Sequence, residues 1–299
     1  RGMRWYVTPV ARAARRWSVV AAGSSPSLRD VLLGFSLSPL PVAMVAGLVT
    51  GYLLGVRRLA RRGRRWPRAR TAAFLAGCGV VAVALVSGVA EYDQSTFSVH
   101  VVQHLLLGML GPLLLALGAP VTLALQAGSR TTKTRLLRIL HSPPIMAVTN
   151  PFVAWLLFSG SLFVLYFTGL YSASQRNFLV HDLVHTHFLV VGMLFFWPVV
   201  GLDPSVWRLH HGARLLYVML ALPVHAFLGI ALLSGQTPLF EAHTLADQHA
   251  GGGILWAVGD LLTLATVAVV LTQWMSHEER ESAREDRLLD AARAARREP

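Results

Sequence analysis

Residues 97–125 read FSVHVVQHLLLGMLGPLLLALGAPVTLAL, a stretch that is long and apolar enough to cross a lipid bilayer as one helix. Its first turns nevertheless carry two histidines, His100 and His104. Ionisable side chains cost free energy inside a membrane, and those that occur there mark functional sites by default. This stretch therefore raises two questions, how many such spans the chain has and what the histidines do.

A second apolar stretch, FLVHDLVHTHFLVVGMLFFWPVVG at residues 178–201, opens in the same way. Its first turns contain His181, His185 and His187. Both stretches begin polar and become apolar, so the histidines of each lie near one end of its helix. We expect the two helices to face each other, and our interpretation of function rests on that pairing.

The composition of the whole chain indicates an integral membrane protein. Of its 299 residues, 54% are hydrophobic and only 14% are charged, whereas soluble domains carry about 25% charged residues. The formal net charge of +12 comes from arginines placed between apolar spans. This placement favours topology signals and contacts with lipid headgroups, and we expect no nucleic-acid partner. The single cysteine, Cys78, excludes an intrachain disulfide and a Cys-x-x-Cys site.

Hydropathy predicts an all-α, polytopic helical bundle with seven transmembrane helices. The chain divides into a partly interfacial N-terminal tail (1–36), a seven-helix transmembrane domain (37–275) and a charged, cytoplasmic C-terminal helix or tail (276–299). Gly108, Gly111 and Pro112 predict close packing or a kink in the third span. The seven predicted spans are 37–56, 71–90, 97–126, 146–170, 178–200, 214–234 and 251–274.

The distribution of Lys and Arg predicts the orientation of these spans. The loops after spans one, three and five and the C-terminal tail hold 8, 4, 2 and 6 of them, whereas the other loops hold only Arg176. We therefore expect the N-terminus outside and the C-terminus in the cytoplasm. The six Arg in residues 1–30 argue the other way, but the contrast between the loops is larger.

This orientation places both histidine pairs just below the outer surface. His100 and His104, and likewise His181 and His185, are four residues apart, so each pair lies on one helix face. The loop before span seven lies on the same side, and so do four acidic residues: Glu91, Asp93, Asp182 and Glu241. Imidazole is a ligand for copper, zinc, iron and nickel, and carboxylates can serve as ligands or orient the histidines. The candidate metal ligands are His100, His104, His181, His185, His243, Asp247 and His249.

Other residues have less specific interpretations. His187 lies about 200° around its helix from His185 and is expected to bond another helix. His225 lies mid-span beside Pro223, where it can reach a nearby carbonyl or extend toward the histidines. Met109, Met193 and Met219 fit ordinary packing better than a copper path. Nucleophile triads, phosphate loops and zincin motifs are absent from the sequence, so we expect no enzymatic activity.

Residues 97–125 resemble the signature of the CtaG family of cytochrome c oxidase assembly proteins, the multi-span kind linked to caa3-type oxidases. Three further stretches are similar to that family: RRGRRWPRARTAAFLAG, HDLVHTHFLVVGMLFFWPVVGLDP and ADQHAGGGILWAVGD, at residues 61–77, 181–204 and 246–260. The resemblance covers roughly 37–275. The family-like positions are His100, Gln103, His104, His181, Asp182, His185, Asp247, Gln248 and Trp256.

The resemblance implies a multi-pass protein of the bacterial plasma membrane that matures a haem–copper oxidase. Its expected partners are oxidase subunits and the lipid bilayer. We hypothesise that the outer-leaflet histidines bind or deliver copper, with an affinity that falls as pH drops because imidazole must be neutral to bind. The alternatives are a haem-binding membrane cytochrome, a copper or proton transporter in which His225 is a relay, and a metal-free scaffold for an oxidase subunit.

Overall fold

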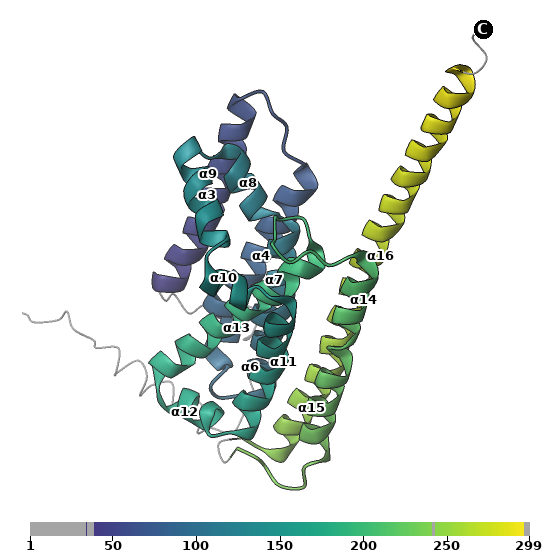
Figure 1. Cartoon of the computed structure of the whole chain (residues 1–299). Coiled ribbons are helices and arrows are strands. Elements are labelled where there is room, and N and C mark those ends of the chain that lie inside the picture. Colours follow the sequence, from purple (N-terminus) through teal and green to yellow (C-terminus); the bar gives the residue numbers. More distant parts are fainter. Residues whose placement is uncertain (1–33, 35–38, 241–242, 296–299) are drawn as a thin grey trace, which may run out of the picture.

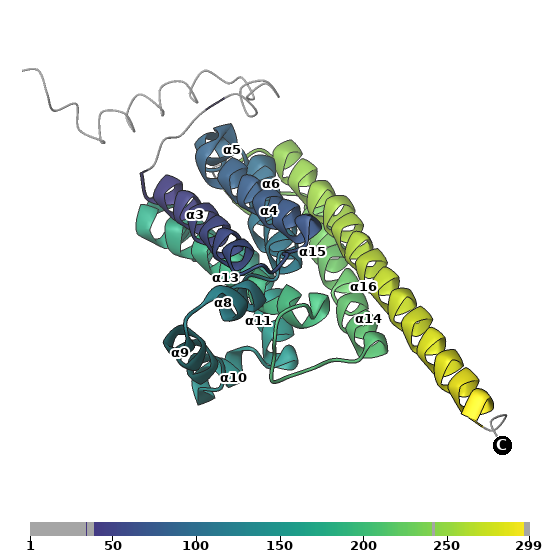
Figure 2. The same cartoon turned by 90° about the horizontal axis from the view of Figure 1, so that it is seen from above.

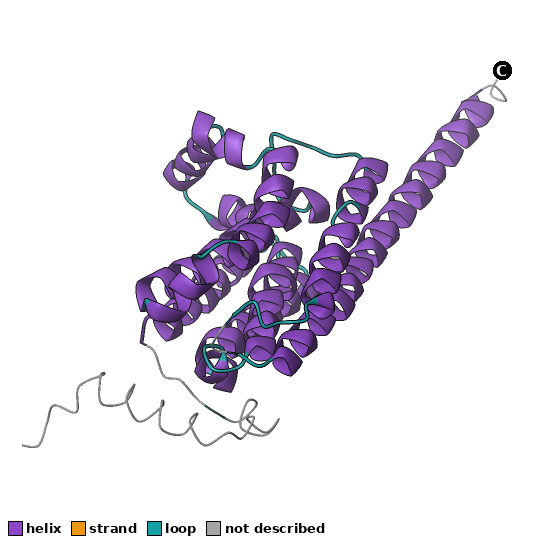
Figure 3. Cartoon of the chain, turned by 90° about the horizontal axis from the view of Figure 1, so that it is seen from below, coloured by secondary structure: helices purple, strands orange, loops and turns teal. Residues whose placement is uncertain are grey.

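The computed structural model describes residue 34 and residues 39–240 and 243–295, and within these ranges it is helical without strands (Figure 3). The all-α class predicted from the sequence is thereby confirmed. The predicted N-terminal tail lies outside the described residues apart from Gly34, as do residues 296–299.

The described residues contain six segments long and apolar enough to cross a membrane, or seven if one bent pair of helices counts as a single span. The polytopic architecture predicted by hydropathy is therefore confirmed, while the predicted orientation of the termini stays a prediction. The six segments are α3 (Pro39–Arg61), α4 (Arg68–Val86), the run Phe97–Ala127, α13 (Phe178–Val200), the run His211–Ser234, and α16 (Leu245–Ala295).

The run Phe97–Ala127 is not one uniform helix. It consists of α6 (Phe97–Leu105), a π-helical turn η1 (Leu106–Leu110), α7 (Gly111–Leu117) and α8 (Pro120–Ala127). Pro112 cannot donate a backbone hydrogen bond to the carbonyl four residues earlier, which belongs to Gly108. The wider turn falls at this position, as π-turns often do where the regular ladder is interrupted. The irregularity predicted from these residues is therefore present.

The bent pair replaces the continuous fourth span predicted at 146–170. Helix α11 (Pro151–Phe167) and helix α12 (Leu170–Arg176) meet at an angle of 72°. Helix α11 begins at Pro151 because Asn150 caps it, accepting hydrogen bonds from the backbone N–H groups of Phe152 and Val153. The basic segment before it, predicted as a loop, forms two short helices, α9 (Arg130–Leu140) and α10 (Pro143–Val148).

Helix α13 packs against η1 and α7 at a point where it has no side chain. A Cβ atom added to Gly192 would overlap the carbonyl oxygen of Gly108 and lie 2.7 Å from Cγ of Pro112. Only glycine permits this approach between the two backbones, as at other small-residue contacts between membrane helices. The contact fixes how α13 sits on the run that carries His100 and His104.

The last two elements of the bundle also pack through glycines. Helix α14 (His211–Met219) leads into α15 (Leu222–Ser234), which runs alongside α16 (Figures 1 and 2). A Cβ atom on Gly229 would lie 2.8 Å from the carbonyl oxygen of Gly252, and one on Gly252 would lie 2.9 Å from that of Gly229. Helix α16 continues without a break past the predicted end of span seven and projects from the bundle (Figure 1).

A smaller core joins α3 and α4 to η1, α7 and α8. The rings of Tyr52 and Phe74 stack with their centroids 3.9 Å apart, and the Tyr52 hydroxyl donates a 2.8 Å hydrogen bond to the Gly118 carbonyl. Cys78 is buried in this core, which fits an apolar filler. The larger core lies between α6, α11, α13, α15 and α16 and surrounds the histidines.

Candidate metal centre

The two histidines of α6 are buried against each other at the start of their helix. Their ring centroids are 4.1 Å apart, as expected for side chains four residues apart on one helical face. His100 is 0% exposed and His104 is 3% exposed. Aromatic rings enclose them: Tyr171 lies 4.9 Å from His100 and Phe188 lies 4.4 Å from His104, between ring centroids.

The second pair lies in the first turns of α13. Asn177 caps this helix by accepting hydrogen bonds from the N–H groups of Leu179 and Val180. The centroids of His181 and His185 are 4.2 Å apart, and both residues are 6% exposed. The cap fixes where the helix begins, and thereby the depth at which both imidazoles enter the bundle.

The structure brings the two pairs together in one cluster. The centroids of His104 and His185 lie 5.8 Å apart, and those of His100 and His181 lie 6.3 Å apart. The expectation that the two spans face each other with their histidines at one depth therefore agrees with the structure. We call these four residues, His100, His104, His181 and His185, the histidine cluster.

A buried carboxylate completes the cluster. Asp93 follows the short helix α5 (Gly88–Tyr92), and its backbone N–H donates to the Val89 carbonyl. Its Oδ2 atom lies 2.8 Å from Nε2 of His181 and 3.8 Å from Nε2 of His185. The sequence analysis predicted Asp93 on the same side of the membrane as the histidine pairs but did not single it out as a ligand. Its position in the short segment between the second and third predicted spans, seven residues before His100, was the available signal.

Two overlapping sets of three side chains have the geometry of metal sites. One is His100, His104 and His185, and the other is Asp93, His181 and His185. Within each set, one potential ligand atom per residue lies within 4.8 Å of the others. His185 belongs to both, so the two positions are adjacent.

Several nitrogens in the cluster have no hydrogen-bond partner in the part of the chain that the structure describes. These buried atoms are both ring nitrogens of His100 and of His104, Nδ1 of His181 and Nε2 of His185. Buried polar atoms without partners are rare in native proteins, and an ion or water is a common explanation. A neutral imidazole offers one lone pair to a metal. The donor set therefore fits a metal ion, which would use lone pairs that the protein leaves unused.

The remaining three predicted ligands have other contacts. Both carboxylate oxygens of Asp247 accept hydrogen bonds at the start of α6, from the N–H of Phe97 at 2.6 Å and the N–H of Ser98 at 3.1 Å. Nε2 of His249 lies 2.9 Å from the carbonyl oxygen of Gly235. Neither residue is part of either set of three. Asp247 instead caps the helix that carries His100 and His104.

His243 lies next to the cluster, separated from it by aromatic rings. Its Nε2 atom is 2.7 Å from the Tyr171 hydroxyl and its Nδ1 atom is 3.8 Å from Asp247. Burial lowers the pKa of His243 below its ordinary value, against the opposing effect of the Asp247 carboxylate. Tyr171 therefore connects His243 with the cluster, because its ring also packs on His100. No sequence pattern pointed to this tyrosine.

Two further histidines have hydrogen bonds of their own. His187 is bonded across helices, with Nε2 2.6 Å from the Ser161 hydroxyl. Nδ1 of His225 lies 3.1 Å from the Ala221 carbonyl beside Pro223. His225 also lines a small cavity together with His104 and Met109. Of the other predicted acidic neighbours, Asp182 is exposed and Glu241 lies outside the described residues.

The cap formed by Asp247 yields a testable prediction. Replacing Asp247 with alanine removes three hydrogen bonds at the start of α6, counting that from the Ser98 hydroxyl, and is expected to lower the free energy of unfolding by about 0.5–2 kcal/mol. Asp247→Asn keeps one acceptor oxygen and loses the other, so it should lose less stability than Asp247→Ala. Thermal unfolding of the purified protein in detergent measures both, and equal losses for the two variants would contradict the capping role.

The fold and cluster together define a class: a multi-pass helical membrane protein with a buried, histidine-rich centre. Within that class, a family model described as cytochrome c oxidase caa3 assembly factor (Caa3_CtaG) matches residues 50–277. The chain belongs to this family, and the resemblance noted in the sequence is confirmed. Membership in an assembly-factor family points to a non-catalytic role.

Curated relatives come from mycobacteria. The chain is 36% identical over 284 residues to an uncharacterized protein of Mycobacterium bovis and to one of Mycobacterium tuberculosis, and 34% identical over 300 residues to one of Mycobacterium leprae. These alignments cover 89% of this chain but 43–45% of the relatives. The chain thus spans less than half the length of these relatives. No solved structure matches it significantly.

Proposed function

We propose that this protein binds copper through the histidine cluster and supplies it during assembly of a caa3-type cytochrome c oxidase. The observation that carries the proposal is the pair of overlapping ligand sets, buried between helices, in which six of the eight imidazole nitrogens lack a hydrogen-bond partner among the described residues. Copper is the cargo of this activity. The role is non-enzymatic, the site of action is the bacterial plasma membrane, and the partner is an oxidase subunit.

The donor set supports copper among the possible metals. Imidazole suits copper in either oxidation state, along with zinc, iron and nickel. The protein's single cysteine, Cys78, lies in the smaller core, which α3, α4, η1, α7 and α8 form, so thiolate does not contribute to the cluster. The family's assembly role concerns a haem–copper oxidase. That role favours copper over the other metals that imidazole binds.

The shared residue His185 supports delivery as well as storage. A set of three histidines and a set with one carboxylate differ in ligand hardness, and hard ligands disfavour the softer cuprous ion. Because both sets use His185, this histidine can stay bound to the ion while the ion moves from one set to the other. We expect the predicted ligands His243, Asp247 and His249 to act around the cluster, by supporting its helices and loop.

Haem binding is the less favoured alternative. Axial haem ligands from facing helices need room for a macrocycle between them, whereas here aromatic rings pack directly on the imidazoles. A visible spectrum of the purified protein decides the matter. We expect no Soret band. A Soret band that disappears in a His104→Ala variant would show that the cluster binds haem and would contradict the copper proposal.

Translocation is a second candidate, favoured by one observation. His225 and Met109 line a cavity with His104, so further ligands lie beside the cluster. A thioether is a soft ligand suited to Cu(I). Copper flux into liposomes that contain the protein would support translocation, and retention of bound copper without flux would support the chaperone role proposed above.

The assembly role is tested in cells. Deleting the gene from its host is expected to leave oxidase subunits in the membrane but to reduce the copper bound per oxidase, measured by mass spectrometry after purification. The wild-type gene should restore the copper and a His104→Ala, His185→Ala variant should not. Oxidase with a full copper complement in the deletion strain would contradict the proposed function.

A further inference from the structure

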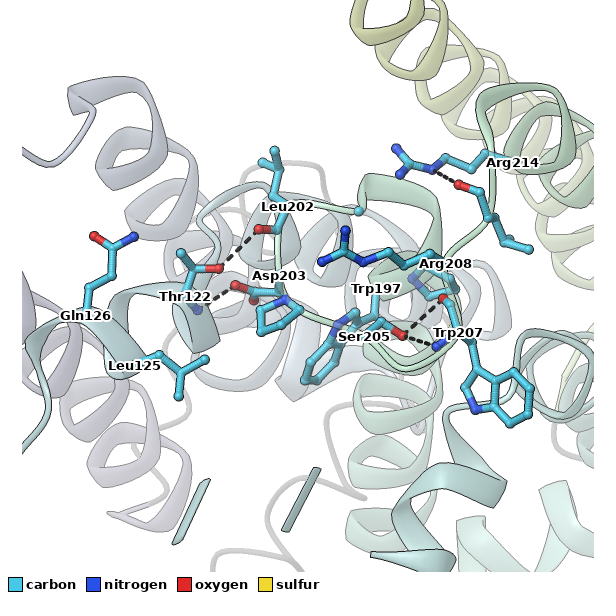
Figure 4. A pocket seen from close by; sticks show the side chains of 14 residues that line it. Thr122, Leu125, Gln126, Trp197, Leu202, Asp203, Ser205, Trp207, Arg208 and Arg214 are labelled. Carbon is cyan, nitrogen blue, oxygen red and sulfur yellow. Dashed lines mark hydrogen bonds between the residues drawn. The ribbon is translucent and has the colours of Figure 1, made fainter. Parts of the chain in front are cut away.

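We propose that a second pocket, at the opposite end of α13 from the histidine cluster, binds a phosphate-bearing anion. The pocket has a volume of about 420 Å³ and lies between α8, the end of α13 and the loop that leads to α14 (Figure 4). This volume falls in the range of about 300–1,000 Å³ found for small-molecule sites. Neither the family description nor the proposed copper role assigns a ligand here.

The position of the pocket places it at a membrane boundary. Trp197 lines it, sixteen residues after His181 on the same helix, which corresponds to about 24 Å along the helix axis. A phospholipid's phosphate lies at this depth, in the headgroup layer that flanks the hydrocarbon core. Thr122, at the start of α8, also lines the pocket.

Two arginines give the pocket its charge. Arg214 is held in place: its Nε donates to the Leu209 carbonyl at 3.0 Å, and one terminal nitrogen donates to Gln273 at 3.4 Å. Its guanidinium lies against Gly201, a residue with φ of +61° where an added side chain would strike it. Arg208 forms neither a hydrogen bond nor an ion pair with the described residues, and Figure 4 shows it extending across the pocket.

The acidic residue in the lining leaves the pocket with a net positive charge. Asp203 accepts hydrogen bonds from the backbone N–H groups of Val121 and Thr122, at 3.1 and 2.7 Å, and so caps α8. It forms no ion pair with either arginine, within the described ranges. The lining therefore has two cations and one carboxylate that is already engaged. Guanidinium groups match phosphate oxygens in geometry and charge.

Two tryptophans add features typical of a headgroup site. The Trp207 indole donates to the Met146 carbonyl at 2.9 Å, which fixes its ring at the pocket edge. The Trp197 indole N–H is buried and lacks a partner among the described residues, so it remains available as a donor. Indoles are enriched at the membrane–water interface because one end is apolar and the other polar.

The surroundings strengthen the attraction for an anion. The same end of the bundle carries the arginine-rich turn between α3 and α4 and the basic helix α9. Clustered positive charge near a membrane surface attracts anionic lipids. Two sources share the phosphate chemistry, an anionic phospholipid headgroup and a soluble phosphate ion, and the experiment below separates them.

The test uses the full chain purified in a neutral detergent, with three probes: dihexanoyl phosphatidylglycerol, dihexanoyl phosphatidylcholine and inorganic phosphate. Binding is followed as thermal stabilisation during titration. Arg208→Gln is expected to weaken phosphatidylglycerol binding about tenfold, the loss of one charged hydrogen bond. The variant should fold normally because Arg208 is exposed and has no described partner. Arg138→Gln, an exposed position on α9 outside the pocket, is the control.

Each outcome has a defined meaning. Stabilisation by phosphatidylglycerol that inorganic phosphate does not reproduce identifies the ligand as a lipid headgroup. Equal stabilisation by inorganic phosphate identifies it as a soluble anion. Either result supports the proposed pocket when Arg208→Gln weakens the binding. Equal affinity of the wild type and Arg208→Gln, an equal loss in Arg138→Gln, or stabilisation by phosphatidylcholine alone would overturn the proposal.

Discussion

Replacing His104 and His185 with alanine is expected to abolish stoichiometric copper binding. The two residues supply two of the three ligands in one set, and His185 is also shared with the set that contains Asp93. Loss of an outer-shell partner alone weakens metal sites by about 10–100-fold, so removing two direct ligands should lower the affinity by at least about 100-fold. Copper per chain is measured by mass spectrometry after equilibration with excess copper and gel filtration.

A matched variant controls for the number of histidines removed. His141 and His277 are exposed and lie outside both ligand sets, so replacing both with alanine should leave the copper content unchanged. Circular dichroism verifies that both double variants keep their helical content. A His104→Ala, His185→Ala protein that binds as much copper as the control would contradict the assignment of the cluster.

The second large effect is expected at Gly192, where no ligand is altered. A methyl group there would overlap the Gly108 carbonyl and press on Pro112, so α13 must move away from η1 and α7. Overpacking of this kind costs about 1–3 kcal/mol. Because α13 carries His181 and His185, the displacement should also weaken copper binding. Thermal unfolding and copper titration of Gly192→Ala measure the two consequences together.

Gly160→Ala is the matched control for this substitution. It is also a helical glycine, on α11, but nothing lies within 4 Å of an added Cβ atom. Alanine should therefore be neutral or slightly stabilising there, because it favours helix more than glycine does. If Gly192→Ala were as stable and as competent for copper as Gly160→Ala, the close contact would not position the cluster.

Hydropathy and helical periodicity predicted most of the fold. Bilayer thickness sets the length of an apolar span, and the 3.6-residue repeat sets which side chains share a face, so both leave patterns within a short stretch of sequence. They placed α13 at 178–200, the range that the structure shows. They ended the fourth span at residue 170 and did not predict that the mostly polar segment after it forms a helix, α12, bent by 72° from α11. The irregular turn before Pro112 was accessible because proline removes a hydrogen bond in any context.

The candidate metal site, like the fold, was predictable from the sequence only in part. Four-residue spacing showed that each histidine pair shares a helix face, and topology showed that the pairs lie at one depth. Which acidic residue reaches them was not predictable, because Asp93 depends on how the loop before α6 folds back. Asp247 had the residue type of a ligand, yet it caps α6. Sequence alone cannot separate these roles, which depend on the direction of one side chain.

The most direct test of the central claim is X-ray absorption at the copper edge on the copper-loaded wild-type protein. Copper bound at the histidine cluster should show nitrogen and oxygen ligands, with the outer-shell scattering characteristic of imidazole rings and without a sulfur shell, since neither ligand set contains a sulfur atom. Copper bound through sulfur, or a spectrum lacking the imidazole contribution, would contradict the assignment of the histidine cluster as the copper site.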